Sequence, residues 1–294
     1  MKRRAIACVP TVRDKTTSEQ FQVGNIDSST DWSPAFAGCD TVVHLAGRVH
    51  QMQERLTDPL ARYRAENRDA TLTLARAAAV HDIRRFIFAS TIKVNGEFTY
   101  GRPFSADDLP HPADAYAQSK FEAEQELREI GDRSGMEIVI VRPSLVYGPG
   151  VRGNFLRLMQ LVEIGVPLPL GSVHNQRSLL ALANLVDFLL LCITLPRAAG
   201  KTWLVSDQHD LSTTELIQLI AAAMGKPARL MPVPAAWLAG LAQLLGKGRE
   251  ASRLLGSLQV DSTAASNLLG WTPAVNVEQA ISATVTHFRG RTSR

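Results

Sequence analysis

A tyrosine and a lysine lie one helical turn apart in the segment Tyr116-Ala-Gln-Ser-Lys120. Side chains at this spacing share one face of a helix, so the phenol and the ammonium can meet the same ligand. A free tyrosine has a pKa of about 10 and is a weak base at neutral pH. A neighbouring cation favours the phenolate, which can exchange a proton with an alcohol. The pair predicts an acid/base site, although the spacing alone also fits an exposed helical pair.

Hydroxyl side chains at the end of a predicted strand favour the catalytic interpretation. The run Arg85–Ser90 is short and apolar, as buried strands of parallel sheets are, and Thr91 follows it directly. Parallel sheets expose their active sites at the C-terminal ends of their strands. Ser90 and Thr91 are therefore candidates for contact with a ligand.

The elements that position these residues alternate between short β-branched runs and longer helical patterns. This alternation predicts an α/β fold in which a parallel sheet is connected by crossover helices. The strands expected in the first half are Arg4–Val9, Thr41–Leu45, Arg85–Ser90 and Glu137–Arg142. One helix is expected over Leu60–Val80. Another, capped by Asp114, should run to about Ser134 with an acidic, exposed face from Glu122 to Glu129.

The character of the chain changes after Pro149-Gly150, where glycine, proline and asparagine become frequent. We expect a first domain over residues 1–150 plus part of 183–210. A smaller lobe over 151–294 is interleaved with it. The elements expected in this lobe are strands at Gln176–Leu182 and Lys201–Val205 and outer helices at Ser212–Met224 and Val277–Phe288.

The composition is that of a globular protein, with 45% hydrophobic and 20% charged residues among 294. The net charge is only +4 and the basic residues are scattered, which argues against a nucleic-acid partner. Three distant cysteines suit a reducing cytoplasm, and Cys8 and Cys192 are expected in the core. The histidines are dispersed without ligand spacing, so no metal site is predicted.

Two apolar segments could interact with a membrane. Leu185–Leu195 contains Asp187 and is too short to span a bilayer, so no transmembrane segment is predicted. Pro234–Leu245 could lie on a membrane surface, but packing against the second lobe is the preferred interpretation. A cytoplasmic protein is expected.

Together these residues resemble the extended short-chain dehydrogenase/reductase family of NAD-dependent nucleotide-sugar epimerases, dehydratases and reductases. The resemblance runs from Arg4 to Phe288 and implies a Rossmann-like, doubly wound sheet with a C-terminal substrate-binding lobe. It makes Thr91 the hydroxyl that polarises the substrate oxygen, Tyr116 the acid/base, and Lys120 its tuner and a ribose ligand. Ser90 is either a second hydroxyl in reach of the cofactor or a strand-end residue.

The resemblance also assigns cofactor-binding residues. In Val43-His44-Leu45-Ala46-Gly47, the small residues Ala46 and Gly47 would let the adenine ribose approach the backbone. Asn67 matches the helical asparagine near the nicotinamide side, and Pro143 lies in the segment that closes over the nicotinamide ring. Asn25-Ile26 stands where the family has Asp-Ile at the adenine. The expected cofactor is NAD, and NADP is the alternative that Arg13 would favour.

On the substrate side, the resemblance assigns three residues to the nucleotide diphosphate. Asn154 offers a neutral donor, and Arg177 offers the bidentate fork that suits phosphate oxygens. Arg253 is a candidate for a second phosphate ligand.

One unit of the family pattern is missing from these 294 residues. The family begins with a strand, a Gly-x-x-Gly-x-x-Gly turn that holds the pyrophosphate, and a helix, and no such turn occurs here. Arg4–Val9 instead matches the family's second strand. We therefore expect the natural protein to start upstream of Met1, and this chain to bind the cofactor weakly.

The reaction expected from the resemblance is 4-epimerisation of a UDP-hexose or UDP-N-acetylhexosamine for surface polysaccharide such as O-antigen. Dehydration is not expected, because Ile92-Lys93 replaces the acidic pair of family dehydratases. Two alternatives stay open: an NAD(P)H-dependent reductase of UDP-4-keto-6-deoxy sugars, and a non-catalytic truncated relative. The family also implies a homodimer formed by the helices that contain Leu74 and Tyr116.

Overall fold

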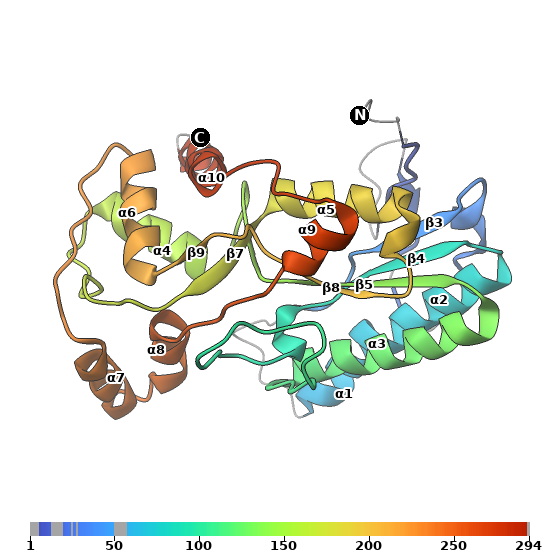
Figure 1. The fold of residues 1–294 in the computed structure, drawn as a ribbon, viewed down its shortest axis with the longest axis horizontal. Helices are drawn as coiled ribbons and strands as arrows, with labels where there is room; N and C mark the ends of the chain where they lie inside the picture. Colours follow the sequence, from blue (N-terminus) through green and yellow to red (C-terminus); the bar gives the residue numbers. More distant parts are fainter. Residues whose placement is uncertain (1–5, 13–19, 25, 28, 50–57, 293–294) are drawn as a thin grey trace. The chain divides into compact units, whose positions relative to one another are not determined.

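Figure 1 shows the chain as a computed structural model that describes residues 6–12, 20–24, 26–27, 29–49 and 58–292. The chain forms two compact units, each assembled from separate stretches of sequence. The first unit consists of Met1–Val94, Pro112–Val141 and Ala198–Thr202, and the second of Asn95–His111, Arg142–Arg197 and Trp203–Arg294. The stretch Asn95–His111 thus belongs to the second unit, whereas the sequence analysis drew the division at residue 150.

The first unit contains β3, β4 and most of β5 of a parallel sheet in the order β3-β4-β5-β8, whose last strand belongs to the second unit from Trp203 on. The strands of this sheet are β3 (Thr41–His44), β4 (Arg85–Ala89), β5 (Glu137–Pro143) and β8 (Thr202–Val205). Thr41 pairs with Arg85, and Arg85 pairs with Glu137. All four strands were predicted to within one residue at either end, and the α/β class with a parallel, Rossmann-like sheet is confirmed.

The helices of the first unit are α1 (Pro59–Tyr63), a π-helical turn (Arg64–Asp69), α2 (Ala70–Val80) and α3 (Ala115–Ser134), with short 3-10 turns at Ser33–Phe36 and Ile92–Val94. Asp114 begins α3 as predicted, because its Oδ1 accepts the Ala117 N–H at 2.8 Å. In Figure 1, α2 and α3 lie side by side along the sheet. Leu72, Phe86, Leu127 and Ile140 form the core of this unit.

The predicted exposed acidic face of α3 is wrong at Glu124. This residue is fully buried, because Lys120, Glu124, Leu127 and Gly131 follow one another at helical spacing along the face that packs inward. The acidic residues of the other faces stay in contact with water.

The first predicted strand, Arg4–Val9, is also wrong where the structure describes it. Ile6 and Val9 are exposed outside any strand, and Cys8 is exposed rather than part of the core. The strand pair found here is β1 (Thr11–Val12) with β2 (Phe21–Gln22). An apolar run becomes a buried strand only where a neighbouring strand offers hydrogen-bonding partners. In this structure Thr11–Val12, rather than the predicted run, pairs with a neighbouring strand.

The second unit contains a three-stranded sheet in the order β6-β7-β9 and most of the later helices. Its elements are β6 (Leu145–Tyr147), α4 (Gly153–Ile164), β7 (Arg177–Ala181), α5 (Leu182–Thr194), a 3-10 turn (Pro196–Ala198), β9 (Asp210–Leu211), α6 (Thr213–Ala223), α7 (Ala235–Leu244), α8 (Gly248–Leu255), α9 (Thr263–Leu269) and α10 (Val277–Thr292). Ser212 caps α6 in a reciprocal box with Glu215. Phe155, Met159 and Ile281 belong to the unit's core, and Cys192 is buried as predicted.

The segment Pro234–Leu245 packs against the second unit as predicted, because α7 lies against α8 and has half-buried residues such as Leu238 and Ala242, but the packing covers only one side of the helix. None of the residues of α7 is buried. Within the described part of the chain, no helix is long and apolar enough to cross a membrane.

Candidate active site

A hydrogen bond joins the side chains of Thr91 and Tyr116. Thr91 follows β4 directly, and Tyr116 lies in the first turn of α3, so one strand end and one helix start bring the two hydroxyls together. Burial, together with the smaller effect of the Asp114 charge, raises the pKa of Tyr116 to about 12, although the hydrogen bond to Thr91 acts in the opposite direction. The chain's own groups thus favour the neutral phenol of Tyr116.

Lys120 lies in the interior of the first unit, on the same face of α3 as Tyr116. Its side chain is 3% exposed, and its Nζ lies 4.0 Å from the centre of the Phe88 ring. Burial lowers the pKa of Lys120 to about 7, although the Glu124 carboxylate favours the charged form. Among the described residues none accepts a hydrogen bond from this ammonium. A buried donor without a protein acceptor is suited to a ligand hydroxyl.

Glu124 is a site residue that the sequence analysis missed. It is fully buried one turn beyond Lys120 and accepts a hydrogen bond from Ser90 Oγ. Ser90 therefore has a structural partner in this structure. Only the helical spacing from Lys120 to Glu124 could have indicated that this carboxylate faces inward.

Asn67, in the π-helical turn, links the loop after β3 to α3. Its Oδ1 accepts the Arg48 N–H at 2.6 Å, and its Nδ2 donates to Arg48 O at 3.0 Å and to Ser119 Oγ at 3.2 Å. Gly47 lies against this link: a Cβ there would stand 3.1 Å from Asn67 Oδ1 and 3.7 Å from Lys120 Nζ. Gly47, which has no side chain, thus lies next to the Lys120 ammonium, for which the described residues offer no hydrogen-bond acceptor.

His44 is buried at the end of β3, three residues before Gly47. Its Nε2 lies 2.9 Å from Thr71 Oγ1, and burial together with the charge of Lys120 lowers its pKa to about 3. His44 is therefore neutral at physiological pH and has no role as a proton donor there.

Lys93 and Asp114 form an ion pair next to Tyr116. Lys93 Nζ lies 2.7 Å from Asp114 Oδ2, and about a third of each side chain is exposed. Lys93 was noted in the sequence only because it replaces an acid of the dehydratases. Nothing in the sequence indicated that Lys93 would pair with Asp114 across the intervening loop.

The second unit brings two of the three predicted substrate residues to one carboxylate. Arg253 Nε lies 2.9 Å from Glu97 Oε1. Burial lowers the pKa of Arg177, and the charge of Glu97 opposes that shift. Arg177 also donates to Gly256 O at 3.0 Å. Asn154 is exposed in the first turn of α4 and makes no described contact with either arginine.

The remaining predicted cofactor residues are spread along the chain. Ala46 is exposed after β3, and Ile26 packs against the core of the first unit. Pro143 is half-buried at the end of β5. Asn25 and Arg13 lie outside the described residues.

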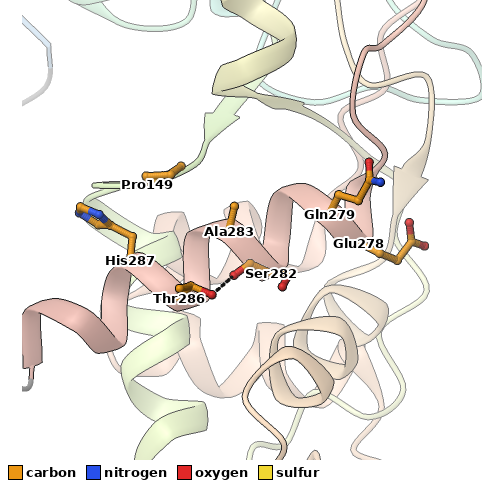
Figure 2. Close-up of a pocket in the computed structure, with 7 residues that line it drawn as sticks. All are labelled: Pro149, Glu278, Gln279, Ser282, Ala283, Thr286 and His287. Carbon is orange, nitrogen blue, oxygen red and sulfur yellow. Dashed lines mark hydrogen bonds between the residues drawn. The ribbon is translucent and has the colours of Figure 1, made fainter.

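Figure 2 shows an open hollow of about 790 Å³ elsewhere in the second unit. It is lined by α10 and Pro149, with Glu278 and His287 as its titratable residues. None of the residues predicted for catalysis or binding lines it, so it is not the candidate site.

Comparisons with known proteins agree with this site. The sequence profile of the NAD dependent epimerase/dehydratase family matches residues 2–206. A UDP-glucose 4-epimerase of Vibrio cholerae is 44% identical over 270 residues, which cover 91% of this chain and 82% of the relative. Among solved structures, the UDP-N-acetylglucosamine 4-epimerase from Bacillus cereus has a TM-score of 0.76 at 20% identity, covering 95% of this chain and 89% of that one.

The UDP-glucuronic acid 4-epimerase from Bacillus cereus, solved in complex with NAD, has a TM-score of 0.75 at 22% identity. The match covers 94% of this chain and 81% of the epimerase chain. Because both identities are below 25%, the two solved structures support the fold alone. The family match covers more than half of the chain, and the Vibrio relative spans most of both sequences. The chain belongs to the NAD-dependent epimerase/dehydratase family.

Proposed function

We propose that this chain catalyses NAD-dependent 4-epimerisation of a nucleotide sugar, a UDP-hexose or a UDP-N-acetylhexosamine. The observation that carries the proposal is the hydrogen-bonded pair Thr91–Tyr116 with the buried Lys120 one turn further along α3. The 44% identity to a UDP-glucose 4-epimerase supports both the reaction and the UDP-sugar class.

The residues present fit the ribose and nicotinamide side of NAD. The Lys120 ammonium, which has no described protein acceptor, suits ribose hydroxyls, and Gly47 leaves room beside it. Asn67 fixes the loop that carries Gly47. Pro143, Ala46, Ile26 and Asn25 are proposed as further contacts. Bound NAD would accept a hydride from the sugar and return it to the opposite face.

The chain's own residues handle the proton. Thr91 holds the C4 oxygen of the sugar, and Tyr116 removes its proton as the hydride leaves C4. The ketosugar then turns over in the site, and Tyr116 returns the proton when C4 is reduced from the other face. A positive charge near the phenol is needed in the first step, because the chain alone raises the pKa of Tyr116 to about 12.

Arg177 and Arg253 are proposed to bind the diphosphate of the substrate. In the ligand-free chain both lie within reach of the Glu97 charge. A diphosphate would offer these guanidinium groups a stronger bidentate partner than a single carboxylate does. Asn154 is proposed as an additional neutral donor.

We further propose a homodimer formed by the helices that contain Leu74 and Tyr116, located in the cytoplasm. Leu74 itself is buried within the first unit, so the contacts would come from the outer side of α2 and α3. The three free cysteines are compatible with a reducing compartment.

The stoichiometry of the cofactor tests the proposal against a reductase. Purified protein is incubated with UDP-glucose or UDP-N-acetylglucosamine and NAD, and the sugars are separated. Formation of the 4-epimer without net change in NADH supports the epimerase. Net oxidation of reduced cofactor with a 4-ketosugar, without interconversion of epimers, would instead assign a reductase.

A further inference from the structure

Helix α7 is apolar on all sides and yet lies at the surface. It runs from Ala235 to Leu244 with the sequence Ala-Ala-Trp-Leu-Ala-Gly-Leu-Ala-Gln-Leu, and none of its residues is buried. A helix that is hydrophobic all round is normally enclosed by a protein core or by a membrane. The packing of this chain therefore leaves the surface of α7 without the apolar surroundings that its sequence requires.

The exposed apolar side chains follow one face of the helix. Trp237, Leu241, Leu244 and Leu245 are spaced at helical intervals, and their exposed fractions are 74%, 57%, 86% and 65%. Leu238 and Ala242 are half-buried on the side that faces the rest of the unit. In Figure 1, α8 lies beside α7, and the two helices form a hairpin.

The charged residues that border α7 in the sequence are basic. Between Glu215 and Glu250 the sequence contains lysines and arginines but no acidic residue. Arg229 and Lys247 are exposed on either side of α7. An apolar face flanked by cations complements a surface that is apolar inside and anionic outside.

The length of α7 excludes a spanning arrangement. Its ten residues extend about 15 Å at 1.5 Å per residue, half of the roughly 30 Å of a hydrocarbon core. A short apolar helix bordered by cations lies in the plane of the bilayer interface instead. Tryptophan is the residue that favours this depth.

We propose that α7 docks on an anionic lipid surface, with Trp237, Leu241 and Leu244 at the boundary between headgroups and acyl chains and Lys247 among the headgroups. The proposal goes beyond the epimerase activity and does not depend on it. Because α8 carries Arg253, docking would hold this proposed phosphate ligand close to the lipid headgroups.

Trp237 is a built-in reporter for the test, because Trp32, Trp203 and Trp271 are all buried. The protein is titrated with vesicles of phosphatidylcholine containing phosphatidylglycerol, and with phosphatidylcholine alone. We expect co-sedimentation with the anionic vesicles and a blue shift of the tryptophan emission. The variant Trp237→Phe should lose the blue shift. Absence of binding to the anionic vesicles would overturn the proposal.

Matched variants separate docking from unspecific adhesion. Leu241→Glu with Leu244→Glu should weaken vesicle binding at least about tenfold, because each carboxylate replaces buried apolar surface. Leu109→Glu removes an apolar side chain that is 90% exposed outside α2, α3 and α7 and should leave binding unchanged. Lys247→Glu should weaken binding to anionic vesicles only.

Unchanged binding of the double variant, confirmed as folded by circular dichroism, would overturn the proposal. So would a dimer in vesicle-free solution that the same double variant dissociates, since a second copy of the chain would then cover α7. Sedimentation velocity at several concentrations distinguishes this outcome from an oligomeric state that the double variant leaves unchanged.

Discussion

The ammonium of Lys93 lies 2.7 Å from Oδ2 of Asp114, the residue that begins α3 and whose charge raises the pKa of Tyr116. The two partners lie on either side of the loop between the end of β4 and the start of α3. Lys93 thereby limits the field that Asp114 exerts on the phenol. Asp114 thus adds to the larger effect of burial on the pKa of Tyr116, the group that is proposed to move the proton.

Replacing Asp114 tests this electrostatic control. Asp114→Asn keeps a capping side chain on α3 but removes the negative charge, so the pKa of Tyr116 should fall. The first step needs the phenolate, so the rate rises with pH through this pKa. The rising limb of the kcat profile should therefore move to lower pH, by about half to one unit. Lys93→Gln should move it to higher pH. Identical profiles for all three proteins would rule out this role for the pair.

Tyr116→Phe removes the proposed acid/base without changing the size of the buried ring. Epimerisation should fall by roughly 10²–10⁴-fold, the usual contribution of a general acid/base. Thr91→Val, which removes the hydroxyl but keeps the branched shape, should also lower kcat. Substrate conversion by Tyr116→Phe at the rate of the unaltered protein would show that another group moves the proton.

The buried Lys120 predicts how stability depends on pH. Its pKa in the folded chain, about 7, lies below the 10.5 of an ordinary lysine. Between these values the unfolded chain binds more protons, so the free energy of unfolding rises with pH across this window. Lys120→Met lacks this contribution. The free energy of unfolding is measured with a denaturant at pH 7 and about pH 9. From the lower to the higher pH, it should rise by up to about 2.5 kcal/mol more for the unaltered protein than for the variant. A constant difference would mean that the pKa of Lys120 is not lowered.

Gly47 offers a test of the cofactor side. A methyl group there would stand 3.1 Å from Asn67 Oδ1 and 3.7 Å from Lys120 Nζ. Gly47→Ala should reduce NAD affinity about tenfold, a cost near 1.4 kcal/mol, and circular dichroism checks that the variant is folded. Gly290→Ala is the control, since a Cβ there meets nothing within 4 Å. Isothermal titration compares them, and equal affinities would place NAD elsewhere.

Local patterns predicted much of this molecule. The strand Arg85–Ala89, the cap Asp114 and the tyrosine–lysine spacing on α3 depend on neighbouring residues, so the sequence alone was sufficient for them. The errors arose where long-range packing decides. Glu124 is buried by its position on α3, and Ile6–Val9 lie outside any strand.

Side-chain pairings across the fold could not be predicted in the same way. Arg253 meets Glu97 although the two are far apart in the sequence, and Lys93 meets Asp114 across a loop. Such contacts depend on how the elements pack, and a charged residue in a sequence has many possible partners. The exposure of α7 belongs to this group, because its apolar sequence alone favoured burial.

The central claim is that the Thr91–Tyr116–Lys120 site interconverts 4-epimers of a nucleotide sugar. The most direct measurement follows UDP-glucose or UDP-N-acetylglucosamine with millimolar NAD by chromatography, with NADH absorbance recorded in parallel. The excess of cofactor ensures that the cofactor site is filled during the measurement. The account predicts conversion to the 4-epimer without accumulation of NADH, and loss of conversion in Tyr116→Phe. Absence of conversion, or equal conversion by the variant, would contradict it.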